Sequence, residues 1–314
     1  MRISAFIRII IWLLIAVLLV SLLVVGLTGA GISWLFRNIE FPFSRRGYMG
    51  YDDSRYTIGT KAVVDSTNID SVEVDWLAGH VEVALHDGGD IEFYESGSGT
   101  LTITPDYQMR YSVDGRVLKI RFARPGVNFI GVFRNLSKTL TLSIPKALYL
   151  ERLSVDTVSA SVAIYGLDAD SIAVNTTSGR IAVSDVGAES LRANTVSGRV
   201  ELSKVNIGEA RIQTISGRIE ANGEFESFVS DSVSGASSAE CAEMPRRVTM
   251  ETVSGSITLR IPENDGFEVR YKRVSGSFNC DFEVTHSGNK AIHKDGGAVF
   301  SFSTVSGGMN IRKN

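Results

Sequence analysis

The sequence predicts an all-β fold, a repetitive β-solenoid with coils of about 19 residues, preceded by one N-terminal transmembrane helix. Three observations lead to this prediction: a recurring Ser-Gly motif, apolar residues that alternate in phase with it, and one apolar run near the N-terminus. The 314-residue chain also has 30 glycines, 6 prolines and many Val, Ile, Ser and Thr residues. That composition suits short strands joined by tight turns.

The motif is Thr-Val-Ser-Gly or a close variant. Its copies are Thr157–Ala160, Thr176–Gly179, Thr195–Gly198, Thr214–Gly217, Ser232–Gly235, Thr252–Gly255, Arg273–Gly276 and Thr304–Gly307. Successive copies are about 18 to 21 residues apart until the last, which follows an insertion. A period of this length is typical of stacked repeats, so each repeat is interpreted as one structural unit.

Apolar residues keep phase with the motif glycine. Ile181 and Val183 stand two and four positions after Gly179, while Val174 and Ile172 stand five and seven positions before it. The other repeats follow the same spacing, which is the alternation of a strand with one face on a core. Each repeat is therefore predicted to contribute two short inward-facing strands and two bends.

The Ser-Gly pair is predicted to form the corner between these strands, with glycine at positive φ and the serine hydroxyl satisfying a backbone group. The corner glycines are Gly179, Gly198, Gly217, Gly235, Gly255, Gly276 and Gly307. We expect positive φ at Gly198 and Gly217, and we expect Val196 and Ile215 to point into the core. A hairpin meander is the alternative. Identical residues once per repeat favour parallel ladders instead, with each coil about 4.8 Å above the one before it.

The N-terminal part divides into a short tail (1–8), a transmembrane helix (9–27) and a juxtamembrane linker (28–67), before a β-repeat domain (68–314). Residues 9–27 are apolar except for Ser21 and Gly26, close to the roughly 20 residues that cross a bilayer. The alternative is a cleaved signal peptide, although this run exceeds the usual apolar length of about 7–15 residues. Basic residues flank both sides of the run, so charge does not decide its orientation.

The segment from 69 to 122 is interpreted as earlier, degenerate coils of the same domain. Ala78-Gly79 is a variant of the Ser-Gly corner, and Asp114-Gly115 is a turn between two strands. Pro145 lies where a strand ends before the regular repeat begins.

Two stretches, SVEVDWLAGHVEVALHDGGDIEF and LTLSIPKALYLERLSVDTVSA, together with the serial motif, resemble the bacterial putative-adhesin family of β-strand repeats, a domain of unknown function. The resemblance covers about residues 68 to 311. It implies a solenoid-like β domain, often tethered to the membrane of Gram-positive-type bacteria and sometimes associated with envelope-stress operons. The family supplies no catalytic residue.

Candidate chemistry is sparse. A net charge of −3 and a pI near 5.9 give no basic field for phosphates, so nucleic acid is not an expected partner. Cys241 and Cys280 fall in different coils, and both thiols are expected to be free. The histidines, His80, His86, His286 and His293, do not have a recognised metal-ligand spacing. We therefore expect no catalytic residue, no cofactor and no metal, and a protein that is not an enzyme.

Arg180, Arg199 and Arg218 directly follow three successive corners, so stacking places them in a column. Glu201 and Glu220 lie two residues further along. The column is either a mutually screened surface ladder or a binding surface for an anionic ligand such as cell-wall polymer or a lipid head group. The apolar segment 126–133 is either a flap that caps the end of the solenoid or a contact with a membrane or partner.

These features favour a single-pass cell-membrane protein whose β domain lies outside the cytoplasm and acts as a binding or adhesion scaffold of the bacterial envelope. Its expected partners are the membrane and either cell-wall polymer or another envelope protein. An accessory regulator of an envelope-stress system, acting through protein contact, is the alternative. A polysaccharide-active β-helix enzyme is a third, weaker reading, because it would demand clustered charged groups in one cleft.

Overall fold

The computed structural model describes residues 51–99, 104–127 and 136–314. The predicted tail, transmembrane helix and first part of the linker lie outside this range. Within it, the chain forms strands and two short 3-10 turns, Asp53–Arg55 and Ser66–Asn68. None of the helices in the described ranges has the length and apolar character needed to span a membrane.

The strands before the regular repeat are β1 (Thr57–Ile58), β2 (Lys61–Val64), β3 (Ser71–His86), β4 (Ile91–Gly99), β5 (Arg110–Asp114), β6 (Val117–Arg121), β7 (Leu136–Pro145) and β8 (Leu150–Tyr165). The strands of the repeat are β9 (Asp168–Thr176), β10 (Ile181–Ser184), β11 (Gly187–Thr195), β12 (Val200–Thr214), β13 (Ile219–Ser234), β14 (Ser237–Cys241), β15 (Arg247–Ser254) and β16 (Ile257–Ile261). The C-terminal strands are β17 (Gly266–Ser275), β18 (Phe278–Cys280), β19 (Thr285–Ser287), β20 (Lys290–Lys294), β21 (Ala298–Ser306) and β22 (Met309–Lys313).

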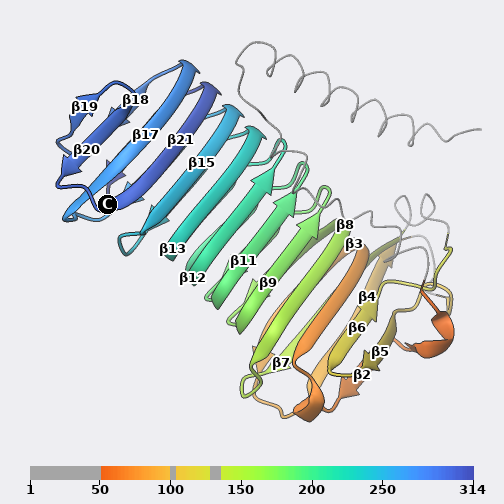
Figure 1. Cartoon of the computed structure of the whole chain (residues 1–314). Coiled ribbons are helices and arrows are strands. Elements are labelled where there is room, and N and C mark those ends of the chain that lie inside the picture. Colours follow the sequence, from red (N-terminus) through yellow and green to blue (C-terminus); the bar gives the residue numbers. More distant parts are fainter. Residues whose placement is uncertain (1–50, 100–103, 128–135) are drawn as a thin grey trace, which may run out of the picture. The chain divides into compact units, whose positions relative to one another are not determined.

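The repeats stack as parallel rungs, each with one strand before its corner and one after it. Strands that precede a corner form the first layer, in which β9, β11, β12 and β13 pair in parallel (Figure 1). Strands that follow a corner form the second layer, in which β8, β10, β12 and β13 pair in parallel. The long strands β8, β12 and β13 pass from one layer to the other. The parallel pairing excludes a hairpin meander for the repeat region.

The two layers enclose the core that the alternation predicts. Ile172 and Val174 of the first layer and Ile181 and Val183 of the second are at most 1% exposed. The equivalent residues of the other repeats are also buried, except Phe278 and Cys280, which are half-buried in the last rung of the stack. A fully buried Val or Ile side chain stabilises the fold by roughly 1.5–3 kcal/mol, so the repeated alternation supplies the main driving force.

The order of the rungs differs from the order of the sequence at the C-terminal end. β21 pairs with both β15 and β17, and β22 pairs with both β16 and β18. The last motif copy therefore lies between the two copies that precede it in the chain, as Figure 1 shows for β17, β21 and β15. The insertion before it forms the antiparallel hairpin β19–β20, which lets the chain return to the skipped position. The expectation that every coil lies directly above its predecessor is wrong here.

The N-terminal end of the stack is closed by antiparallel strands. β3 pairs in parallel with β8, and Gly79 lies opposite Ala160, so Ala78-Gly79 is the variant corner that the sequence predicts. β4 and β5, however, run antiparallel to β7 and β6, and they are not degenerate coils. β1 and β2 extend this cap, so the described part of the predicted linker, residues 51–67, belongs to the β structure.

Candidate functional site

The Ser-Gly corner is held by backbone contact between rungs and by the motif threonine. The backbone N–H of Gly179, Gly198 and Gly217 donates to Oγ1 of Thr176, Thr195 and Thr214 at 2.9, 2.8 and 2.8 Å. A Cβ at Gly198 would lie 1.8 Å from the carbonyl oxygen of Gly179 in the neighbouring rung. Glycine is needed here because the rungs touch through their corner backbones.

Two expectations about the corner are wrong. Gly198 and Gly217 do not have positive φ, unlike Gly235, Gly276 and Gly307, whose φ values are 150°, 129° and 152°. Val196 and Ile215 are half-buried, and they do not point into the core as predicted. The motif threonines are buried in their place, because a threonine can bond to the glycine N–H across the corner. The recurrence of threonine in the motif was the available signal.

The three column arginines lie on the surface, and each is ion-paired with a glutamate. Arg180 and Arg199 both bind Glu201, the latter at 3.0 Å, and Arg218 binds Glu220 at 3.4 Å. The arginine side chains are 58%, 47% and 56% exposed. Partial burial acts to raise the pKa of Glu201, but hydrogen bonds from Arg180 and Arg199 hold that pKa below its usual value. The structure therefore brings the predicted column together, with three guanidinium groups against two carboxylates.

A polar row, Asp156, Asn175, Asn194, Gln213, Asp231 and Glu251, runs along the first layer, one residue before each motif. Asn175 donates to Asp156 and Asn194 donates to Asn175, each at 2.8 Å, and Gln213 donates to Asp231 at 3.2 Å. Burial raises the pKa of Asp231 to about 6, and it also raises the pKa of Asp156 and Glu251. The row was not predicted from the sequence, although the residue before each motif copy is polar.

The N-terminal cap contains a fully buried ion pair. Lys138 Nζ lies 2.5 Å from Glu95 Oε2 and also donates to the carbonyl oxygens of Tyr107 and Phe122. The Trp76 and Phe122 rings stand 4.7 and 4.0 Å from the ammonium group. Desolvation lowers the pKa of Lys138 to about 8, against the opposing field of Glu95. Because every donor direction is occupied by protein, this pair has a structural role.

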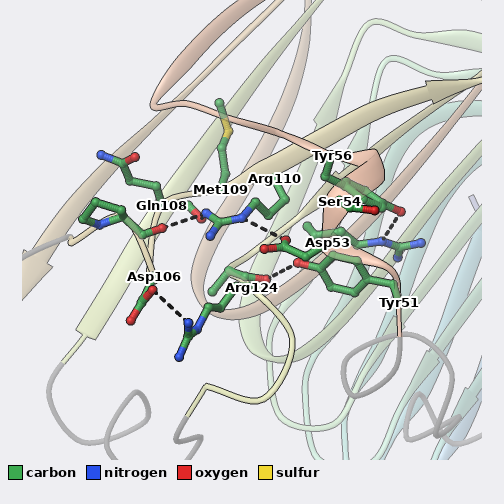
Figure 2. A network of polar contacts seen from close by, with 12 residues as sticks. Tyr51, Asp53, Ser54, Tyr56, Asp106, Gln108, Met109, Arg110 and Arg124 are labelled. Carbon is green, nitrogen blue, oxygen red and sulfur yellow. Dashed lines mark hydrogen bonds and ion pairs between the residues drawn. The ribbon is translucent and has the colours of Figure 1, made fainter.

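A second network fastens the start of the described chain to the cap (Figure 2). Arg110, 2% exposed, donates to Asp53 at 3.1 Å and to the carbonyl oxygens of Pro105 and Gln108 at 2.8 Å each. The Tyr51 hydroxyl donates to the carbonyl oxygen of Ala123 at 2.5 Å. Burial, with the nearby Asp53 carboxylate, raises the pKa of Tyr51. This network anchors the residues that connect the β stack to the N-terminal segment.

The other candidates for chemistry are dispersed. Within the described ranges, no three His, Cys, Asp or Glu side chains are placed to hold a metal ion. His293 is buried, and its Nδ1 lies 2.7 Å from the carbonyl oxygen of Glu283, whereas His286 contacts Tyr271. Both cysteines are free, as predicted, and three strand spacings separate β14 from β18. Most of the apolar segment 126–133 lies outside the described residues.

The chain was compared with known protein families and with curated proteins. The family model of Toastrack DUF4097 matches residues 78–312. This chain belongs to the Toastrack DUF4097 family. Among curated proteins, no relative matches it.

Three solved structures are among those similar to this Toastrack chain. A putative adhesin from Bacteroides fragilis is 14% identical with a TM-score of 0.49, covering 80% of this chain and 95% of that one. A putative adhesin from Parabacteroides distasonis is 12% identical with a TM-score of 0.45, covering 80% and 96%. A putative lipid binding protein from the same species is 15% identical with a TM-score of 0.42, covering 80% and 95%.

Proposed function

We propose that this Toastrack protein is a membrane-anchored binding scaffold of the bacterial cell envelope, with its stack of rungs acting as a β-solenoid outside the cytoplasm. The exposed column of Arg180, Arg199 and Arg218 carries the proposal, because it presents three guanidinium groups against two carboxylates on the surface. Guanidinium groups bind phosphate oxygens through paired hydrogen bonds. The ligand that fits is a phosphate-bearing polymer or lipid head group.

The family match and the apolar run near the N-terminus support this role. The family match covers residues 78–312, and several solved structures of similar fold are named as putative adhesins. The apolar run at residues 9–27 has the length of a single membrane span. A regulatory role through protein contact would draw on the apolar segment 126–133, most of which the structure does not describe.

Membrane topology is tested by adding protease to intact protoplasts that carry the full chain. The proposal expects the β domain to be degraded from outside while the anchor stays in the membrane fraction. Protection of the domain, or a soluble form that lacks residues 1–30, contradicts the proposed location.

Ligand binding is tested with the detergent-solubilised full chain, using poly(glycerol phosphate) in one arm and phosphatidylglycerol vesicles in the other. The variant with Arg180, Arg199 and Arg218 all replaced by Ala should lose about tenfold or more in affinity. A matched control replaces Arg116, Arg246 and Arg270, whose side chains are 66%, 84% and 70% exposed. Equal losses in both triple variants would mean that only net charge matters, and the column would then not be the binding surface.

A further inference from the structure

Each rung of the stack donates backbone hydrogen bonds to the next at the residue two positions after the corner. Val162, Val200 and Ile257 donate to the carbonyl oxygens of Arg180, Arg218 and Gly308 at 2.8, 2.9 and 2.9 Å. Met309 donates in the same way to Ser277 at 2.8 Å. This regular pattern makes a missing bond easy to identify.

The pattern stops at the rung of β17 and β18, the last in the stack. Gly255 and Gly307 donate their N–H groups to Ser306 and Ser275 at 3.1 and 3.3 Å. The equivalent N–H of Gly276 has no backbone acceptor among the described residues, and β18, which begins at Phe278, pairs on one side only, with β22. The β19–β20 hairpin covers β17 from Gly266 only as far as Tyr271, whose N–H donates to the carbonyl oxygen of Asn289 at 2.9 Å. We call the uncovered edge, residues 272–280, the open corner.

The open corner shares a positive φ with two occupied corners, Gly235 and Gly307. Gly276 has a φ of 129°, and a Cβ there would lie 1.9 Å from the carbonyl oxygen of Gly307. Behind it, the Tyr271 and Phe278 rings stack with centroids 4.2 Å apart and planes at 8°. The edge is thus held in place from one side, and a strand that pairs with it would meet a preorganised template.

The charge of the open corner selects its partner. Lys272 and Arg273 are exposed, and neither has a carboxylate ion-pair partner within the described ranges. Val274 beside them is 69% exposed. Lys272 acts electrostatically on Glu251 two rungs away, and Arg273 lies 5.7 Å from the centroid of the Tyr271 ring. Two cations on an edge, neither in a close ion pair, oppose pairing with a second copy that carries the same cations, and they favour an acidic strand.

We propose that the open corner docks an extended, acidic segment of a partner protein, which adds to the stack as its next rung. Backbone groups at Gly276 and Phe278 supply the affinity, and Lys272 and Arg273 supply the preference for acidic side chains. This inference deepens the proposed scaffold role, on which it rests, by naming a class of partner.

The test measures binding of a fluorescent octapeptide of alternating Glu and Thr to the solubilised full chain. Binding should weaken about tenfold or more in the Lys272→Glu/Arg273→Glu variant. The matched reversal Arg246→Glu/Arg247→Glu, which changes net charge equally at the opposite edge of the rungs, should leave affinity unchanged. A peptide N-methylated at alternate residues keeps its charge but loses strand donors, so it should not bind. Hydrogen exchange at Gly276 and Phe278 should slow when the unmodified peptide binds.

Several outcomes would overturn the proposal. These are absence of binding at millimolar peptide, equal binding of the N-methylated peptide, or a dimer in sedimentation equilibrium that disappears in the Lys272→Glu/Arg273→Glu variant. If the wild-type protein binds the polymer through the arginine column but does not bind the peptide, the open corner is rejected as a docking site and the proposed function stands. If it binds the peptide but not the polymer, the arginine column is rejected as a binding surface and the open corner stands.

Discussion

The chain turns at both edges of each rung, and the two turns are built differently. At the Ser-Gly corner, neighbouring backbones touch and the residues repeat, with Gly179, Gly198 and Gly217 all unable to accept a Cβ. At the opposite edge, which we call the bend, the turn residues are Gly166, Asp185 and Lys204, with φ of 68°, 55° and 53°. The bend recurs at a regular period, but its residue type differs between repeats. Its Asp185 and Lys204 are exposed.

The difference teaches that contact between rungs, more than backbone conformation, produces the visible repeat. Positive φ is a mild restriction that Asp or Lys can meet at a cost of roughly 1–2 kcal/mol. A carbonyl oxygen 1.8 Å from the site of a Cβ cannot be accommodated by any side chain. The same residues therefore recur at the corner, whereas the residues at the bend vary from repeat to repeat.

The largest effect is expected from Gly198→Val at the corner. The new side chain would overlap the Gly179 carbonyl and force two rungs apart, so the free energy of unfolding should fall by about 3 kcal/mol or more. Urea unfolding followed by circular dichroism measures the change. Gly89→Val is the control for a glycine with space around it, because a Cβ there would meet no atom within 4 Å and its φ is not positive. A Gly198→Val protein as stable as wild type would remove the distinction between corner and bend.

The polar row beside the corner predicts a pH effect for Asp231→Asn. Because burial raises the pKa of Asp231 from 3.8 to about 6, the folded protein binds this proton more tightly than the unfolded chain. The resulting cost is absent below pH 4, grows between pH 4 and 6, and is complete above, at about 2–3 kcal/mol. Asp231→Asn should therefore stabilise the fold at pH 8 and change little at pH 4.

Asp185→Asn, at the exposed bend, is the matched change for this pH comparison. It should leave the difference in unfolding free energy between pH 4 and pH 8 unaltered, because its side chain is 60% exposed. An Asp231→Asn variant with the wild-type pH profile would show that Asp231 does not carry a buried charge.

At the bend, Lys204→Gly should raise the free energy of unfolding by about 0.5–1 kcal/mol, since glycine adopts positive φ without a Cβ clash but is more flexible when unfolded. Lys204→Ala keeps the same strain and serves as control. Thermal unfolding compares the two variants. Destabilisation by glycine would mean that the Lys204 side chain, and not its backbone, matters at the bend.

The smallest effect is expected from Arg199→Ala. Its side chain is exposed and its ion pair with Glu201 is one of two that this glutamate makes, so unfolding free energy should change by less than about 0.5 kcal/mol. A clear loss of stability would make the arginine column structural, and the binding surface proposed for it would lose its basis.

The fold and the candidate surface were predictable to different depths. The period, the two strands per repeat, the variant corner at Ala78-Gly79 and the arginine column follow from local spacing, and the structure contains them. The buried Lys138–Glu95 pair and the Arg110 network were not predictable, because their partners are 43 and 57 residues apart in the chain. The role of the motif threonine was not predicted, although threonine recurs in the motif, because a hydroxyl can bond to several local backbone groups and its position in the repeat does not say which.

The sequence by itself determined the all-β class, the length of a rung and which side chains enter the core, since these depend on alternation within a few residues. Tertiary structure alone decided the order of the rungs. The last motif copy pairs between β15 and β17 because its strands complete hydrogen bonds on both sides there, and identical corners make every rung an acceptable neighbour for every other. Because the repeats are so similar, their sequences do not specify the position of each rung in the stack. The β19–β20 hairpin fixes the position of the last rung through the length of its connection.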